Sequence, residues 1–300
     1  MARNTFDSAA PDTVVLIHGL WMTPLSWEHW IERYTNRGYR VIAPGWPGMD
    51  GDIAQLRRDP SPIARLDAGV IVDHYERIIR QLVRPPIIMG HSFGGAFVQL
   101  LLDRGLGTAG VAIDAAPVKG VLGLPLSTIR SVWPILRNPA NLNKAVGLTA
   151  KQFHYAFTNT LSAQASAKVY ERYHVPGAGR VLFQDALANV GSRTVFRVDF
   201  SRAERAPLLF IAGGSDHVVP AWINKSNAAH YRKSKAITGY KLFPGRSHYT
   251  LGQDGWEDVA DYALNWAAKN ATARAAGSSR LPRVPERRPD AAARAGATNA

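Results

Sequence analysis

The sequence of 300 residues contains no cysteine. This absence excludes disulfide bonds, thiolate metal ligands and a cysteine nucleophile. The chain also lacks a run of about 18 apolar residues, the length that a membrane-spanning helix requires. Its first residues, MARNTFDSAAPDT, lack the apolar stretch of a signal peptide. We therefore expect a soluble, cytoplasmic protein with no stable insertion into a membrane.

Motifs for several common chemistries are also missing. The chain has no G-x-x-x-x-G-K-[ST], no H-E-x-x-H and no G-x-G-x-x-G after its first apolar run. Its nine histidines are scattered without the spacing of metal ligands. Phosphate-cradling, zinc-protease and dinucleotide chemistries are therefore disfavoured, and the sequence predicts no metal site.

The net charge of +13 is concentrated in two stretches. Residues 271–300 carry a net charge of +4 and are rich in Ala, Arg, Pro and Gly, so we expect a disordered basic tail there. Residues 118–205 carry +8. Because the tail has arginines without interleaved aromatic residues, no nucleic-acid partner is expected. The charge of 118–205 favours steering of anionic substrates or transient contact with an anionic surface.

Apolar runs alternate with helical patterns along most of the chain. The expected strands are 13–19, 39–44, 85–89, 109–117, 206–214 and 238–245. Helices are expected after the Thr23-Pro24 cap and at 63–82, 95–105, 221–233 and 255–269, the last with a capping box from Asp254 and Glu257. This pattern predicts an α/β fold: a mostly parallel sheet of about six to seven strands with helices on both faces.

Residues 118–205 interrupt the alternation. About 90 residues between two strands are too many for a simple crossover, and they read as helices and loops. We expect a mainly helical cap over the carboxyl edge of the sheet, where open α/β sheets bind ligands. The domain prediction is a core of residues 1–117 and 206–270, the cap 118–205 and the tail 271–300.

One short stretch carries the strongest indication of chemistry. Gly90-His91-Ser92-Phe93-Gly94 matches G-x-S-x-G and lies between an expected strand and an expected helix. That context is typical of a nucleophile elbow, a strained turn that lifts a serine hydroxyl above the sheet edge. A simple Gly/Ser turn is the alternative. We take Ser92 as the candidate nucleophile.

A serine nucleophile needs a base and an acid that orients the base. Asp216, in GGSDHVVP, and His248, in FPGRSH, follow two later strands in the order acid, then histidine. Both are therefore expected at the same sheet edge as Ser92. Asp114, in AIDAAP, is the alternative acid. His217 is a poorer base because it shares the loop of Asp216.

The stretch HGLW supplies the remaining candidates. The backbone N–H groups of Leu20 and Phe93 are the expected oxyanion donors, with His18 in a structural role. Trp21 is expected at the pocket mouth, although a plain core position is nearly as well supported. The aromatic residues of the insertion are candidate pocket residues or simply its own core: Trp133, Phe153, Tyr155 and Phe157.

HGLW, GHSFGG, GGSDHVVP and GRSH together make the chain resemble the α/β-hydrolase superfamily over about residues 12–268. The resemblance implies Ser92 as nucleophile, Asp216 as acid, His248 as base, and no metal or organic cofactor. It differs in one respect, because too few residues precede the first strand for the antiparallel hairpin common in this family.

The expected reaction is hydrolysis of a small to medium apolar carboxylic ester through an acyl-enzyme. Serine members of this superfamily also hydrolyse carbon–carbon bonds, thioesters or lactones, or act as hydroxynitrile lyases, and the sequence does not separate these reactions. A non-catalytic ligand receptor is the alternative from another class. The sequence indicates no oligomeric state.

Overall fold

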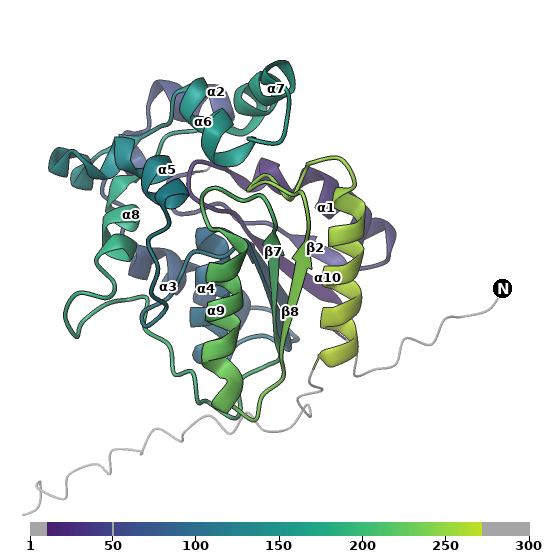
Figure 1. The fold of residues 1–300 in the computed structure, drawn as a ribbon. Helices are drawn as coiled ribbons and strands as arrows, with labels where there is room; N and C mark the ends of the chain where they lie inside the picture. Colours follow the sequence, from purple (N-terminus) through teal and green to yellow (C-terminus); the bar gives the residue numbers. More distant parts are fainter. Residues whose placement is uncertain (1–10, 50, 272–300) are drawn as a thin grey trace, which may run out of the picture.

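The computed structural model describes residues 11–49 and 51–271. Figure 1 shows a central sheet between two layers of helices, with further helices above one end of the strands. Apart from Ala271, the expected basic tail lies outside the described residues. No helix in the described part of the chain combines the length and apolarity that crossing a bilayer needs.

The central sheet has six strands, all parallel, in the order β2-β1-β3-β4-β7-β8. Its strands are β1 (Thr13–Ile17), β2 (Arg40–Ile42), β3 (Ile87–His91), β4 (Ala109–Ile113), β7 (Leu208–Gly213) and β8 (Thr238–Phe243). These segments correspond to the six expected strands, and the predicted fold class is confirmed. No antiparallel hairpin precedes β1 among the described residues.

Helices cover both faces of the sheet, which explains the unbroken apolar runs of the inner strands. On β1, Val14 and Leu16 face one layer, while Val15 and Ile17 face the other, and all four are fully buried. The first layer contains α1 (Glu28–Asn36) and α10 (Trp256–Asn270). The second contains α3 (Ala68–Arg80), α4 (Phe93–Asp103) and α9 (Ala221–His230).

Three helix starts differ from the sequence prediction, and α4 is one of them, since it begins at Phe93 and not at residue 95. Helix α3 begins at Ala68 because the Asp67 side chain accepts a hydrogen bond from the Gly69 amide and ends the preceding irregular stretch. The capping box predicted at α10 is wrong. Gly255, with φ 76°, is the N-cap and contributes no side-chain hydrogen bond. At the other end of the core, Thr23 caps the short helix η1 (Pro24–Trp27), as its sequence predicts.

The stretch between β4 and β7, residues 118–205, is called the inserted segment below. It forms α5 (Leu126–Leu136), η3 (Pro139–Asn143), α6 (Ala150–Phe157), α7 (Ala163–Tyr173), α8 (Gly179–Ala186) and a two-stranded ribbon of β5 (Ala145–Val146) and β6 (Gly177–Ala178). In Figure 1 its helices lie above the carboxyl ends of the strands, beside α2 (Ile53–Arg58). The remaining short helices are η2 (Ser61–Ile63) and η4 (Tyr231–Lys233).

The strand order explains where a site can form. After β1 the chain adds β2 on one side, and β3 then pairs with the other side of β1. In open α/β sheets, ligands bind at the carboxyl edge where the strand order reverses in this way. The HGLW stretch follows β1 and Ser92 follows β3, so both lie at this switch in strand order.

Candidate active site

Ser92 lies in a sharp turn between β3 and α4. Its backbone has φ 55° and ψ −118°, a conformation that non-glycine residues rarely adopt. The turn is tight because a Cβ atom on Gly94 would lie 2.1 Å from the Ile17 carbonyl oxygen, so only glycine fits there. The side chain of Ser92 is thus held at the edge of the sheet by a strained backbone, the geometry expected of a nucleophile elbow.

Asp216 and His248 meet at the same edge. Oδ1 of Asp216 accepts hydrogen bonds from the amides of Val218 and Val219, at 2.7 and 2.9 Å. Its Oδ2 lies 2.7 Å from Nδ1 of His248, which therefore carries the proton and donates it. The loop after β7 thus fixes the carboxylate, and the carboxylate fixes the imidazole.

The second nitrogen of His248 is buried and has no hydrogen-bond partner among the described residues. The Asp216–His248 hydrogen bond is therefore formed, whereas one from His248 to Ser92 is not. Catalytic hydrogen bonds are often long in ligand-free enzymes and shorten only when substrate is bound. A buried imidazole nitrogen that is neither protonated nor bonded remains available to accept a proton.

Burial and charge act in opposite directions on His248. Burial alone would lower the pKa of this histidine, but the charge and hydrogen bond of Asp216, helped by Asp114, outweigh it and raise the pKa above the ordinary 6.5. The adjacent His91 is different. Burial and the nearby His248 hold the pKa of His91 well below its usual value, so His91 is neutral.

Asp114, the alternative acid, follows β4 and is fully buried at φ 45°. Its Oδ1 accepts a hydrogen bond from the Gly213 amide at 2.6 Å, at the start of the loop that carries Asp216. Burial, with the nearby charge of Asp216, raises the pKa of Asp114 to about 7. Asp216, not Asp114, forms the hydrogen bond to His248.

The loop after β1 lies directly against the elbow. A Cβ atom on Gly19 would lie 2.8 Å from the Cβ of Ser92. His18 is buried and neutral, since burial lowers its pKa to about 4. Its Nδ1 donates to the Gly19 carbonyl at 3.0 Å and its Nε2 accepts from the Trp46 amide at 3.2 Å. These bonds hold the backbone before Leu20.

The two expected oxyanion donors differ in their surroundings. Phe93 is the first residue of α4, where backbone amides have no acceptor within the helix and the helix dipole is positive. Leu20 precedes Trp21, whose φ is 66°. Ser92, Asp114 and Trp21 are the three non-glycine residues with positive φ in the described ranges. Ser92 and Asp114 each directly follow a strand, and Trp21 lies in the loop after β1.

The candidate pocket residues do not lie together. The Phe157 ring lies edge-on to the His248 ring with centroids 4.7 Å apart, and Trp21 contacts Phe157 at 6.0 Å. Phe153 stacks on Phe157 with ring centroids 4.8 Å apart and is fully buried. Tyr155 is half-buried beside His217. Trp133 is 57% exposed on the outer surface of α5.

His91 is a site residue that the sequence analysis did not single out. Its Nε2 donates to the backbone carbonyl of His248 at 2.8 Å. The hydrogen bond fixes the loop that carries the imidazole. The position of His91 immediately before Ser92 was the only hint in the sequence, because its partner is 157 residues away.

A ring nitrogen of His91, one of His248 and a carboxyl oxygen of Asp114 lie within 4.8 Å of one another. This spacing is compatible with a metal ion. However, Nδ1 of His248 is bonded to Asp216 and Nε2 of His91 to a carbonyl group. Each histidine thus has one nitrogen engaged, whereas Nε2 of His248 and Oδ2 of Asp114 have no hydrogen-bond partner among the described residues.

These features agree with the family comparison. The model of the alpha/beta hydrolase family matches residues 14–262, so the chain belongs to this family. Epoxide hydrolase B of Mycobacterium tuberculosis is similar in sequence. It is 24% identical over 271 residues, which cover 83% of this chain and 72% of that protein.

Solved structures show the same fold at low sequence identity. The esterase of Thermogutta terrifontis has a TM-score of 0.62 and 16% identity, covering 88% of this chain and 92% of that one. An extracellular α/β-hydrolase from a Paenibacillus species has a TM-score of 0.61 and 19% identity, covering 86% and 100%. The monoacylglycerol lipase of Paleococcus ferrophilus has a TM-score of 0.59 and 20% sequence identity, and the match covers 87% of this chain and 96% of that one.

Proposed function

We propose that this hydrolase cleaves carboxylic esters through an acyl-enzyme on Ser92. One observation carries the proposal. The Asp216–His248 hydrogen bond leaves the other imidazole nitrogen without a partner, at the sheet edge where the strained turn holds Ser92. A carboxylate, an imidazole and a serine in such an arrangement activate the hydroxyl for attack on a carbonyl carbon.

In the first half of the reaction, the Ser92 oxygen bonds to the carbonyl carbon while Nε2 of His248 takes the hydroxyl proton. The carbonyl oxygen becomes an oxyanion, which the amides of Leu20 and Phe93 stabilise. His248 then gives its proton to the departing alkoxide, and the alcohol leaves. Each preorganised oxyanion donor contributes about 10²–10³ in rate.

In the second half, Nε2 of His248 takes a proton from water as the water oxygen attacks the acyl-serine. The tetrahedral intermediate collapses, Ser92 recovers its proton from His248, and the carboxylic acid leaves. Asp216 remains ionised throughout and stabilises the imidazolium ion in both halves.

The surroundings of His248 favour an apolar substrate. Leu20, Trp21 and Phe157 are all buried near the elbow or the imidazole. Polar acyl chains would lose hydration in such a site without gaining hydrogen bonds. We therefore propose a small to medium apolar ester as the substrate.

Epoxide hydrolysis is the reaction named for the relative from M. tuberculosis. A carboxylate nucleophile would open an epoxide to an alkyl ester, which water can hydrolyse. A serine would instead form an ether, which the same histidine cannot hydrolyse. Because residue 92 is serine, we favour acyl transfer over epoxide opening.

A reactive fluorophosphonate tests the nucleophile, and a chain-length series of nitrophenyl esters tests the substrate class. We expect labelling of the wild type and none of Ser92→Ala, with turnover highest for apolar acyl groups. Thioesters, lactones and a carbon–carbon substrate belong in the same panel, because the triad serves these bonds as well. An unlabelled wild type that binds esters without turnover would instead indicate a receptor.

A further inference from the structure

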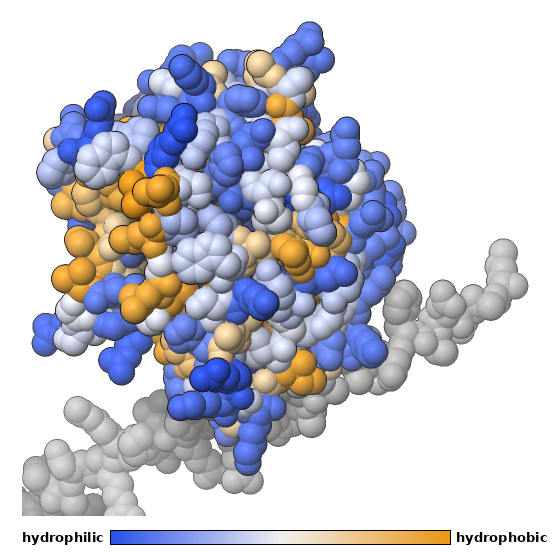
Figure 2. Space-filling view, viewed as in Figure 1, coloured by the Kyte–Doolittle hydropathy of each residue, from blue (hydrophilic) through white to orange (hydrophobic). Residues whose placement is uncertain are grey.

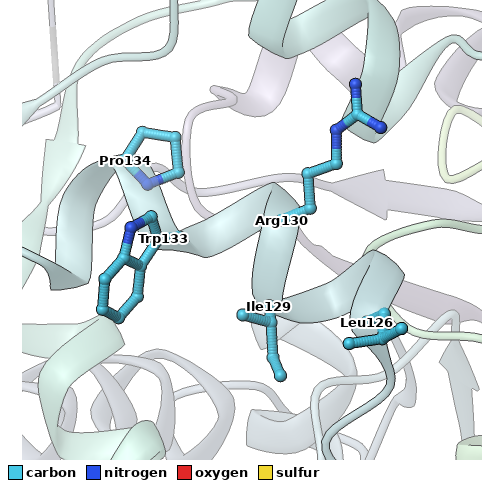
Figure 3. A pocket seen from close by; sticks show the side chains of 5 residues that line it. All are labelled: Leu126, Ile129, Arg130, Trp133 and Pro134. Carbon is cyan, nitrogen blue, oxygen red and sulfur yellow. The ribbon is translucent and has the colours of Figure 1, made fainter.

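Helix α5 presents an apolar stripe to solvent. Leu126, Ile129 and Trp133 follow the spacing of one helical face and are 84%, 37% and 57% exposed. Figure 3 shows these three side chains on one side of α5, with Arg130 directed away from them. Together with Arg130 and Pro134 they line an open hollow of about 410 Å³. Surface helices ordinarily turn such a stripe toward the core.

Rotation of α5 cannot bury this stripe, because its opposite side is tied to the core. Thr128 Oγ1 donates to the Val218 carbonyl at 2.7 Å. Ser131 Oγ donates to the Ser127 carbonyl within α5 at 2.8 Å and also lies 3.3 Å from the His217 carbonyl oxygen. Ile135 is also buried on this inner side. The outward direction of the stripe therefore follows from the Thr128 hydrogen bond to the loop that carries Asp216 and from the burial of Ser131 and Ile135 on the inner side.

The stripe belongs to a larger surface. Leu122 and Leu124, just before α5, are strongly exposed, and the exposed Trp222 packs against Gly123 between them. The apolar side chains on the α5 side of the molecule form orange patches in Figure 2. The apolar patch, as the term is used below, consists of Leu122, Leu124, Leu126, Ile129, Trp133 and Trp222.

The charge around the apolar patch has one sign. The sequence has no Asp or Glu between residues 115 and 170 but contains six Lys or Arg there. None of these six forms an ion pair with a described residue. Arg130 and Arg137 lie on α5 and at its C-cap, and both are exposed. Lys144 is exposed after η3, which is hydrogen-bonded to α5 through Asn141.

We propose that the apolar patch and its neighbouring cations form a docking surface for an anionic phospholipid membrane. Leucine and tryptophan side chains enter the boundary between headgroups and acyl chains, while arginine and lysine bind anionic headgroups. Both kinds of side chain are present here on one helix. A second copy of this chain fits poorly, because a symmetric contact would bring two acid-free cationic segments together.

Vesicle sedimentation with the full chain tests the proposal. The vesicles contain phosphatidylcholine alone or with phosphatidylglycerol, at low and high salt. We expect binding that requires phosphatidylglycerol and weakens with salt. Arg130→Gln and Arg137→Gln should each weaken it about fivefold, and Leu126→Ser and Trp133→Ala about tenfold or more.

Matched variants elsewhere serve as controls. Val83→Ser removes a fully exposed apolar side chain, and Arg232→Gln removes an exposed cation in η4, at the opposite end of α9 from the site edge. Both should bind like the wild type. The arginines beyond residue 271 are the same in every variant, so differences between variants report the patch.

Three outcomes would overturn the proposal. The first is no binding of the wild type to anionic vesicles. The second is equal binding by patch and control variants, which would assign the affinity to another region. The third is a dimer in solution that Trp133→Ala dissociates, which would make the patch a contact between copies. Thermal unfolding of each variant confirms that it is folded.

Discussion

The ring of Phe157 meets the imidazole of His248 edge-on, with centroids 4.7 Å apart. The backbone carbonyl oxygen of Phe157 also accepts a hydrogen bond from the Tyr249 amide at 2.9 Å. The inserted segment thus contacts the candidate base through a side chain and the following residue through the backbone. The environment of His248 is therefore set in part by the insertion and not by the sheet alone.

Phe157→Ala tests this contact through the pH dependence of turnover. Burial is the largest influence on His248 and lowers its pKa, so removing Phe157 should admit water and move the pKa higher. The midpoint of kcat/KM against pH should therefore rise. Phe153→Ala is the control, because Phe153 is equally buried and stacks on Phe157 without contacting His248. Equal shifts in both variants would show a general loosening.

The wild-type pH profile is a second prediction. His248 must be neutral to accept the Ser92 proton, and its pKa is raised above 6.5. The kcat/KM should therefore fall as pH decreases through a midpoint above 6.5. Stopped assays with an uncharged nitrophenyl ester measure this midpoint. A midpoint well below 6.5 would contradict the conclusion that the charge and hydrogen bond of Asp216, together with Asp114, outweigh burial.

Asp216 and Asp114 should respond differently to the same substitution. Asp216→Asn removes the charge that orients His248 and should lower kcat about 10⁴-fold. Asp114→Asn keeps the oxygen that accepts from Gly213, so its effect should stay within about tenfold. Steady-state kinetics of both variants decide the matter. Comparable losses would mean that the two carboxyl groups share the role.

The raised pKa of Asp114 also predicts how stability changes with pH. Its pKa is about 7 in the folded protein and 3.8 for the ordinary group, so the unfolded chain releases the proton first. As pH rises from 3.8 to about 7, this carboxyl group increasingly opposes folding, and above pH 7 its effect is constant.

Asp114→Asn should therefore gain free energy of unfolding relative to wild type between those pH values. Urea unfolding at several pH values measures the difference. A constant difference across the range would mean that Asp114 is ionised in the folded protein throughout.

Gly94→Ala tests the packing of the elbow. The added Cβ would overlap the Ile17 carbonyl, which belongs to the backbone of β1 and cannot rotate away. We expect a loss of about 1–3 kcal/mol or more in the free energy of unfolding, together with lower labelling of Ser92. Gly69→Ala is the comparison, since its nearest neighbour is the movable carboxylate of Asp67 at 3.0 Å. Similar stability in both alanine variants would argue against a tight elbow.

The sheet could be predicted because its strands are short apolar runs that end at turn residues. β1 and β7 are entirely buried, and burial on both faces makes each strand a continuous apolar run, which is easy to recognise in the sequence. Helix starts were harder to predict. The start of α10 depends on the left-handed conformation of Gly255, which the acidic residues around it did not indicate.

Some residues of the candidate site could likewise be predicted from the sequence, and others could not. Chain order alone brings Ser92, Asp216 and His248 to one edge, because each follows a parallel strand. Residue type does not tell Phe157, which touches His248, from Trp133, which faces solvent. Both are aromatic residues of the inserted segment. Their different positions depend on how the segment folds back over the sheet, which no local pattern records.

Two hydrogen bonds of Trp21 hold the loop after β1 against the inserted segment. The Trp21 indole donates to the Val146 carbonyl at 2.9 Å, and the Trp21 carbonyl accepts from the Val175 amide at 3.0 Å. Val146 and Val175 both belong to the inserted segment. Any displacement of the inserted segment would therefore either break these two hydrogen bonds or move the backbone next to Leu20, the proposed oxyanion donor.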